Sequence, residues 1–457
     1  MINKKQLFAV VSLLAVLTIF SCSSDKKESD EQTTTASLSS SVKHPSWSKK
    51  AVIYEVNIRQ HTQEGTFKAF ENDIPRLKKM GIDILWLMPI NPVGEENRKG
   101  TLGSYYAVKD YMAVNPEFGT EEDLKSLIKT AHDNGMKVLL DWVANHTAWD
   151  HVWTEKHKDW YTLSEAGEFV PPVEDWSDVI DLDYMNSDMR EAMLDAMKYW
   201  VEEFDIDGYR CDVAEMVPMD FWDNVRKELD AIKPVFMLAE GEDPELHINA
   251  FDMSYGWELM HLMRGVASGE KEISDIKDMY ERDFARFPEG YIKMNVITNH
   301  DENSWNGTAE EFFGPAQQAW TVFAATTYGM PLVYSGQEAN NKKRLEFFEK
   351  DPIDWSGGYV FEYLMKTLFI LKSQNSALWN GQGSLEWIST AHDDKLIVFR
   401  RAYDDNEVLV MINTSGEELT FELDREYPAM IRAFGGGIVT LQPEQKIAPY
   451  GYKVFSK

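Results

Sequence analysis

Cysteine is scarce in this sequence, which holds two among 457 residues, Cys22 and Cys211. So few cysteines exclude the disulfide framework that stabilises many small secreted domains. Basic residues are also few, because 46 Lys and Arg stand against 76 Asp and Glu and give a net charge of −30. Nucleic acids and anionic lipid surfaces are bound by clustered Lys and Arg. The composition therefore argues against both as partners, whereas a neutral polymer is not repelled.

The amino terminus has the pattern of an export signal. Two lysines precede an apolar run, 7–20, which is too short to span a bilayer comfortably. Ser21 and Cys22 follow it and resemble a bacterial lipobox, whose cysteine becomes the lipidated N-terminus. We expect residues 1–22 to be a lipoprotein signal peptide, with a plain signal peptide or a transmembrane anchor as alternatives. The protein would then be exported and lipid-anchored to the bacterial cell envelope, at the outer membrane or cell surface.

Residues 23–44 are polar, rich in Ser and Thr, and nearly free of large apolar groups. Such a segment cannot bury enough apolar surface to fold. We predict that this segment is a flexible tether. The protein would then contact the membrane only through its lipid anchor.

Apolar strand patterns and amphipathic helix patterns alternate from Val52 onward. The expected strands are 52–56, 82–90, 137–143, 207–212, 236–240, 251–256, 295–300 and 331–336. Strands that are apolar on both faces and separated by helices indicate parallel β/α units, and eight of them fit a closed (β/α)8 barrel, the TIM barrel. An open doubly wound sheet is the alternative. We find no Gly-rich phosphate loop after the first strand, which argues against a dinucleotide-binding fold.

Two segments depart from this alternation. The stretch 147–184 is rich in Trp and His and too long for a simple loop, so we predict a small inserted domain. The stretch 379–457 has short alternating runs broken by turn residues, which predicts a small all-β sandwich domain. The barrel then covers 45–146 and 185–378.

Polar residues stand at the carboxyl ends of several expected strands. They are Asp141, Asn145, His146, Arg210, Asp212, Glu240, Asn299, His300 and Asp301. Barrel enzymes build their active sites at these ends. For any one acid a capping or surface role is the simpler explanation, but their recurrence at successive strands favours a common site.

This set of groups suits glycoside cleavage. One carboxylate attacks the anomeric carbon, a protonated carboxylic acid protonates the leaving oxygen, and further negative charge stabilises the transition state. Strand alternation puts Arg210 and Asp212 on one face and Cys211 on the other. Arg210 should therefore keep Asp212 ionised by lowering its pKa, and Cys211 should be a buried packing residue.

Six motifs in order resemble glycoside hydrolase family 13, the α-amylase family. They are GSYYAVKDYMAVNPEFGT (103–120), DWVANH (141–146), GYRCD (208–212), LAEG (238–241), TNHD (298–301) and GMPLVYSGQE (329–338). The resemblance covers nearly everything after the tether. It implies that 147–184 is the family's domain B and that 379–457 is its C-terminal β domain.

The resemblance also implies residue roles. The catalytic set would be Asp212 as nucleophile, Glu240 as general acid/base and Asp301 as transition-state stabiliser. Tyr106 would stack on the sugar at the cleavage subsite, and the residues that bind hydroxyls or orient carboxylates would be His146, Arg210 and His300. The negative charges of Asp212 and Asp301 should raise the pKa of Glu240, which has no cation beside it in sequence.

The implied activity is retaining hydrolysis of α-glucosidic bonds, mainly α-1,4, in starch, glycogen or maltooligosaccharides. The alternative is a transglycosylase or an exo-acting α-glucosidase. A more remote alternative is a non-catalytic glucan-binding lipoprotein, and the presence of all three catalytic acids argues against it. Aromatic residues of the inserted segment could be sugar platforms or core residues: Trp149, Trp153, Trp160 and Trp176. The sequence does not indicate an oligomeric state.

The chemistry requires no cofactor, but a structural calcium ion remains an open question. Asn145 and Asp181 resemble two calcium ligands of the family. Glu215 and Met216 stand where many members have a Lys-His pair, although the Met216 carbonyl could still be a ligand. Hard cations need several oxygen ligands, so the site is weakened rather than excluded.

Overall fold

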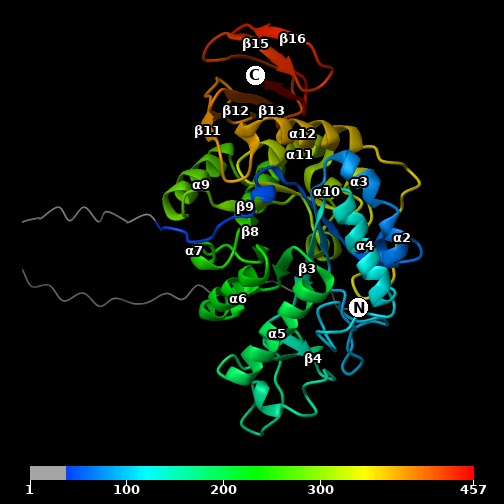
Figure 1. The fold of residues 1–457 in the computed structure, drawn as a ribbon. Helices are drawn as coiled ribbons and strands as arrows, with labels where there is room; N and C mark the ends of the chain where they lie inside the picture. Colours follow the sequence, from blue (N-terminus) through cyan, green and yellow to red (C-terminus); the bar gives the residue numbers. More distant parts are fainter. Residues whose placement is uncertain (1–37) are drawn as a thin grey trace, which may run out of the picture. The chain divides into compact units, whose positions relative to one another are not determined.

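The computed structural model describes residues 38–457 (Figure 1). Cys22, the expected signal peptide and most of the expected tether lie outside these residues. Eight strands form a closed parallel barrel in the order β1-β10-β9-β8-β7-β6-β3-β2. Their bounds are β1 (Ile53–Val56), β2 (Ile84–Leu87), β3 (Lys137–Trp142), β6 (Gly208–Cys211), β7 (Phe236–Ala239), β8 (Met253–Tyr255), β9 (Ile292–Asn295) and β10 (Met330–Tyr334). The predicted (β/α)8 barrel is confirmed, and the open-sheet alternative is wrong.

The first strand, β1, closes the barrel by pairing with both β2 and β10. Ile53 lies opposite Leu332 of β10 and opposite Ile84 of β2, so β1 is hydrogen-bonded on both edges. Nearly every barrel-strand residue is buried, which explains the continuous apolar runs in the sequence.

The seventh strand was placed too late by the sequence pattern. We expected it at 295–300, whereas β9 covers Ile292–Asn295 and the polar residues 299–301 lie beyond its end. The cause is Lys293, a charged residue inside the strand that interrupts the apolar run. Its Nζ lies 2.8 Å from Asp283 Oδ2 on the covering helix α9 (Ile273–Arg286), and this ion pair compensates for the burial of both charges.

Helices surround the barrel, as Figure 1 shows. They are α1 (Ile58–His61), α2 (Phe67–Glu71), α3 (Ile74–Met80), α4 (Glu121–Asp133), α5 (Ser187–Phe204), α6 (Met219–Ile232), α7 (Leu246–Asn249), α8 (Trp257–Ser268), α9 (Ile273–Arg286), α10 (Ala309–Phe313), α11 (Gln317–Thr326) and α12 (Glu362–Gln374). Short 3₁₀ or π turns are η1 (Ser46–Lys50), η2 (Lys158–Trp160), η3 (Ala214–Met216), η4 (Glu302–Asn306), η5 (Gly314–Ala316), η6 (Gln337–Ala339) and η7 (Ser376–Leu378). Helix α4 begins with a capping box, in which Thr120 and Asp123 exchange hydrogen bonds. No helix among the described residues is long and apolar enough to cross a bilayer.

The segment between β3 and α5 contains one antiparallel pair, β4 (His146–Ala148) with β5 (Val179–Asp181). Within it, Trp160 is buried, and the Trp153 ring packs edge-on against it with 5.1 Å between centroids. Trp160 belongs to the hydrophobic core and Trp153 packs against that core. The exact bounds of the inserted domain remain a prediction.

The C-terminal residues form two β-sheets. A six-stranded sheet has the order β11-β12-β13-β18-β15-β16, and β14 pairs with β17. The bounds are β11 (Ser384–Trp387), β12 (Leu396–Tyr403), β13 (Asn406–Asn413), β14 (Leu419–Glu422), β15 (Tyr427–Arg432), β16 (Ile438–Leu441), β17 (Glu444–Ile447) and β18 (Tyr452–Ser456). Apolar side chains of both sheets, such as Val398 and Phe421, form one buried cluster. This is the sandwich that the alternation predicts.

The last residues of the expected tether contact the barrel. Ser41 N donates to Ile248 O over 2.7 Å, and His44 Nδ1 lies 2.8 Å from Asp252 Oδ1. The flexible segment that we placed at 23–44 therefore does not extend to residue 44.

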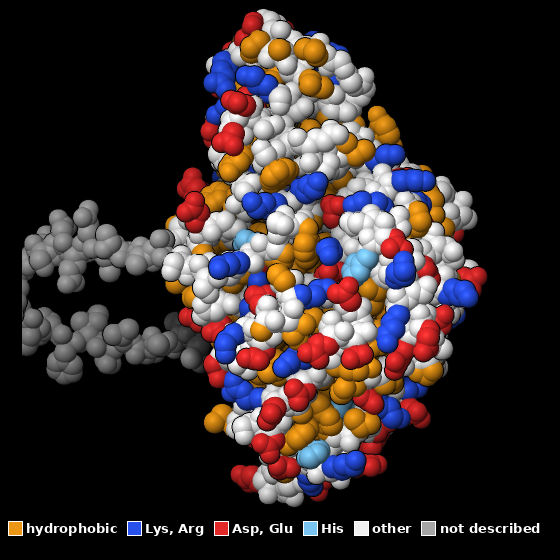
Figure 2. Space-filling model, in the orientation of Figure 1, with side chains coloured by type: hydrophobic (Ala, Val, Ile, Leu, Met, Phe, Trp, Pro, Cys, Tyr) orange, Lys and Arg blue, Asp and Glu red, His pale blue; other side chains and the backbone are white. Residues whose placement is uncertain are grey.

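On the face drawn in Figure 2, Lys and Arg side chains are interspersed with Asp and Glu side chains.

Candidate active site

A cavity of about 280 Å³ contains six of the seven residues for which we predicted catalytic or substrate-binding roles. Those that line it are Tyr106, His146, Asp212, Glu240, His300 and Asp301. The seventh, Arg210, lies beneath and is fully buried. The barrel explains this convergence, because each residue follows or ends a parallel strand and these strand ends share one rim.

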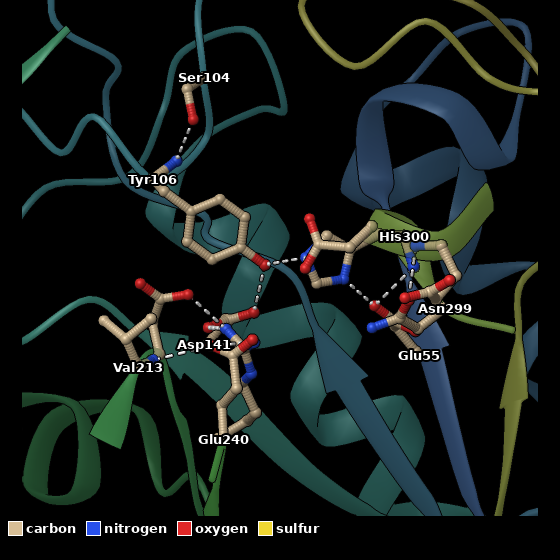
Figure 3. A network of polar contacts seen from close by, with 12 residues as sticks. Glu55, Ser104, Tyr106, Asp141, Val213, Glu240, Asn299 and His300 are labelled. Atoms are coloured by element: carbon tan, nitrogen blue, oxygen red, sulfur yellow. Dashed lines mark hydrogen bonds and ion pairs between the residues drawn. The ribbon is translucent and has the colours of Figure 1, made fainter. Parts of the chain in front are cut away.

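Arg210 connects three carboxyl groups. Its Nη1 donates to Asp141 Oδ1 and to Asp212 Oδ1, each over 2.8 Å, and its Nη2 lies 2.9 Å from Glu240 Oε2. Glu240 Oε2 also accepts a hydrogen bond from Val213 N over 2.7 Å (Figure 3). Glu240 has no cation beside it in sequence, but the fold brings the Arg210 guanidinium to it. The reason is that Arg210 and Glu240 come from adjacent strands, β6 and β7, whose pairing the sequence does not display.

The electrostatics of Asp212 differ from the expectation. Burial raises the pKa of its carboxyl group well above the usual range, Arg210 opposes the rise, and the carboxylates of Glu240 and Asp141 add to it. Arg210 thus acts in the predicted sense, but burial outweighs it. The site places one guanidinium among three carboxyl groups, an arrangement that favours retention of a proton by one of them.

His300 connects the other side of the cavity. Its Nδ1 contacts Glu55 Oε1, while its Nε2 lies 2.8 Å from Tyr106 Oη and 3.2 Å from Asp301 Oδ2 (Figure 3). Burial alone lowers the pKa of His300, but Asp301 and Glu55 outweigh burial and raise it well above the ordinary value. For Asp301, burial raises the pKa, and the charge of His300 more than offsets this and lowers it. Asp301 is therefore held as a carboxylate beside an imidazolium.

Tyr106 is fixed in orientation at the cavity wall. Its hydroxyl donates to Asp141 Oδ2 over 3.0 Å, and its ring stacks on His300 with centroids 5.4 Å apart. Its backbone N–H donates to Ser104 Oγ over 3.1 Å. A ring held in this way offers a rigid apolar face to a sugar.

His146 is a neutral member of the site. Burial lowers its pKa to about 4, and the nearby Asp178 opposes the shift only in part. The imidazole lies edge-on to Trp176, with 5.5 Å between ring centroids. At neutral pH it can therefore both donate and accept hydrogen bonds from sugar hydroxyls.

Comparison with known proteins agrees with this geometry. The family model for the catalytic domain of α-amylase matches residues 27–355, which is well over half of the chain. The chain belongs to the α-amylase family of glycoside hydrolases. It is 33% identical to the maltogenic α-amylase AmyB of Thermotoga neapolitana, whose crystal structure superimposes with a TM-score of 0.81 over 89% of this chain and 98% of that one. An α-amylase structure from Lactobacillus plantarum is 31% identical, with a TM-score of 0.81 over 90% and 99% of the two chains.

A curated member of the family is more distant. The α-amylase MalA of Haloarcula japonica is 25% identical over 83% of this chain, and the match spans 57% of the length of MalA. The chain is thus shorter than this relative. Membership shows the fold and the enzyme class, while the roles of individual residues stay predictions.

An aromatic wall beside the cavity was missed by sequence reasoning. Trp305, Phe347 and Phe348 line it. The Phe347 ring stacks on Tyr106 with 6.2 Å between centroids and lies tilted to Trp305, with 5.3 Å between centroids. These residues come from loops after β9 and β10, so no local pattern connects them. Of the four tryptophans considered as sugar platforms, Trp176 lines this cavity.

The proposed calcium ligands do not by themselves form a calcium site. Asp181 Oδ2 accepts a hydrogen bond from Thr162 Oγ1 over 2.6 Å, and burial together with Asp183 raises the Asp181 pKa. One carboxylate and the Asn145 amide fall short of the several oxygens that a hard cation needs. Within residues 38–457 no cluster of three or more His, Cys, Asp or Glu is arranged to hold a metal ion. The proposed chemistry uses no metal ion, and the dispensability of calcium stays a prediction.

Proposed function

We propose that this α-amylase family member is a retaining hydrolase that cleaves α-1,4-glucosidic bonds in starch, glycogen or maltooligosaccharides. The observation that carries the proposal is the shared guanidinium: Asp212 and Glu240 contact the two Nη atoms of Arg210. This holds the two carboxyl groups close together. Retaining enzymes need a separation of about 5–5.5 Å, whereas inverting enzymes need more room for a water molecule.

The contacts assign an atom to each role. Glu240 Oε2 is occupied by Val213 N–H and Arg210, which leaves Oε1 as the atom that carries the proton for the leaving oxygen. Asp212 Oδ1 is occupied by Arg210, so Oδ2 is the atom that attacks the anomeric carbon. Asp301, ionised beside His300, then stabilises the positive charge that develops on the sugar ring. Water releases the glycosyl group in the second half-reaction, with Glu240 as the base.

The surroundings of these acids favour cleavage within a chain. The cavity that holds Asp212 shares Val213 and Glu240 with a neighbouring hollow of about 280 Å³. That hollow shares Glu242 and Trp257 with a third, of about 610 Å³, which reaches back to Asp301. A glucan could therefore occupy both sides of the cleavage point, which an exo-acting enzyme with a closed pocket does not allow.

Product analysis tests the activity. Proton NMR of early starch hydrolysis should show the α-anomer first, and chromatography should show a range of maltooligosaccharides rather than glucose alone. Pullulan and maltotriose as parallel substrates separate α-1,6 cleavage and short-chain action. An Asp212→Asn variant is the control for contaminating amylase. An initial β-anomer would contradict retention, and glucose as the sole early product would contradict endo action.

We further propose that the chain is exported and attached to the cell envelope by lipid on Cys22. The support is the amino-terminal sequence alone: the apolar run, Ser21-Cys22 and the polar segment after it. A Cys22→Ala variant should lose fatty-acid labelling and leave the membrane fraction. Continued membrane attachment of that variant would show a transmembrane anchor instead.

A further inference from the structure

Glu55 is a buried carboxyl group beneath the active site that the mechanism above does not use. It lies on β1 and is 0% exposed. Its Oε1 contacts His300 Nδ1, and its Oε2 has no hydrogen-bond partner among the described residues. A buried carboxylate is costly unless a charge or a hydrogen bond compensates it. The contact with His300 is therefore the interaction that compensates for the burial of the Glu55 carboxyl group.

The donors and acceptors around His300 fix its protonation. The Tyr106 hydroxyl has one hydrogen, which goes to Asp141 Oδ2. Both Asp141 oxygens already act as acceptors, because Oδ1 accepts from Arg210 Nη1 and Oδ2 from the indole N–H of Trp86. Tyr106 Oη is then an acceptor for His300 Nε2, as is Asp301 Oδ2. His300 Nδ1 faces a second carboxyl group, that of Glu55. Both ring nitrogens thus face acceptors, and a neutral imidazole has a single N–H.

We propose that Glu55 is a positioning residue that keeps His300 doubly protonated, and through His300 keeps Asp301 ionised and oriented for the transition state. The charged and titratable groups around this pair are consistent with that role. Burial lowers the pKa of His300, but Asp301 and Glu55 outweigh burial and raise it. Burial raises the pKa of Glu55, and His300 is the largest influence that opposes this rise; Arg210 also opposes it, whereas Asp141 adds to it. This inference deepens the proposed function, since it assigns a task to a residue outside the catalytic set.

A Glu55→Gln variant separates charge from shape. The glutamine carbonyl oxygen can still accept from His300 Nδ1, but the negative charge is gone. The pKa of His300 should fall by roughly one to three units, because it loses an opposite charge in contact. A group with a raised pKa loses its proton as pH rises, so the alkaline limb of kcat/KM should move to lower pH by a similar amount. Near the acidic end of the profile the variant should approach wild-type activity.

The matched control is Asp83→Asn. Asp83 is an ion-paired acid that precedes β2 at the opposite end of the barrel strands, with Oδ1 2.8 Å from Lys78 Nζ. This variant also removes one negative charge but should leave the pH profile unchanged. If Glu55→Gln lowers kcat/KM equally at every pH, its role is structural and the proposal is overturned.

A second measurement needs neither the Glu55→Gln variant nor an activity assay. Histidine-selective ¹⁵N labelling of the wild-type protein reports each imidazole, and comparison with His300→Gln assigns the His300 signals. Both ring nitrogens should carry protons at pH 7 and above. A singly protonated His300 at pH 7 would overturn the inference, whereas absence of starch hydrolysis would overturn the proposed function and leave this measurement valid.

Discussion

Replacement of Arg210 by methionine removes the cation that Asp141, Asp212 and Glu240 share. The guanidinium is fully buried and lies 2.8–2.9 Å from an oxygen of each carboxyl group. At roughly 4 Å between charge centres and an effective dielectric constant of about 20, each pairing amounts to about 4 kcal/mol. Loss of this pairing should raise the pKa of the Asp212 carboxyl group further, because Arg210 opposes the rise that burial causes. The ionised fraction of the nucleophile, and with it kcat/KM, should fall up to about 1,000-fold at neutral pH, the factor to which about 4 kcal/mol corresponds.

The variant should also unfold more easily. Removal of one partner from a buried ion pair costs about 3–5 kcal/mol. The stability of this variant should depend on pH because of the three carboxyl groups. Their pKa values in the folded variant would exceed those in the unfolded chain. They would be neutral at low pH and would have to ionise inside the protein as pH rises, so the stability deficit should grow with pH.

Arg226→Met is a matched control. Arg226 is also buried and ion-paired, with Nη1 2.8 Å from Asp252 Oδ2 and Nε 2.7 Å from Asp230 Oδ2, but it lies outside the active site. Urea unfolding and kcat/KM on starch should be measured for both variants between pH 5 and 8. Both should lose stability, and only Arg210→Met should lose activity at temperatures where both are folded. Equal activity in the two variants would refute the reasoning.

Three further predictions follow from particular side chains. Trp305→Ala should raise KM about fivefold more than Trp305→Phe. Both variants lose the indole N–H, but only Trp305→Ala loses an aromatic ring, whose contact with a sugar is worth about 1 kcal/mol. Equal KM values for the two variants would show that the aromatic wall does not bind glucan. Burial lowers the pKa of His146 to about 4 and those of His151 and His247 to about 3. Below about pH 6.5 the unfolded chain therefore binds more protons than the folded protein. The free energy of unfolding should fall as the pH is lowered from 6.5 to 4, by about 3 kcal/mol for His146 alone. A free energy of unfolding in urea that does not change over this pH range would contradict the prediction. Gly208→Ala should destabilise by about 3 kcal/mol or prevent folding, since a Cβ there would lie 1.9 Å from Phe236 O of the next strand. A soluble variant with wild-type stability would contradict this close approach of the two strands.

The barrel was predictable because its strands are short apolar runs separated by helices, and because polar residues end them. That pattern places Asp212 and Glu240 at one rim without any knowledge of strand pairing. Where a charge enters a strand, as at Lys293, the pattern fails by a few residues. The prediction was therefore sound for the order of elements and weaker for their bounds.

The parts of the site that escaped prediction depend on tertiary contacts. Glu55 looks like an ordinary strand residue in the run VIYEV, and its contact with His300 spans 245 positions in the sequence. The aromatic wall brings Trp305 of η4 and Phe347, which follows β10, beside Tyr106, although the three residues lie far apart in the sequence. The net pKa shift of Asp212 could not be foreseen either, because it depends on how deeply the carboxyl group is buried.

The division of roles between Asp212 and Glu240 is the central claim, and two variants on two substrates test it directly. Starch has a poor leaving group that needs a proton, whereas fluoride leaves an α-glucosyl fluoride with little protonation. Glu240→Gln should therefore nearly abolish starch hydrolysis and keep some fluoride turnover. Asp212→Asn should lose both, because no glycosyl-enzyme can form. With folding verified by circular dichroism, fluoride turnover by Asp212→Asn together with its loss in Glu240→Gln would contradict the account.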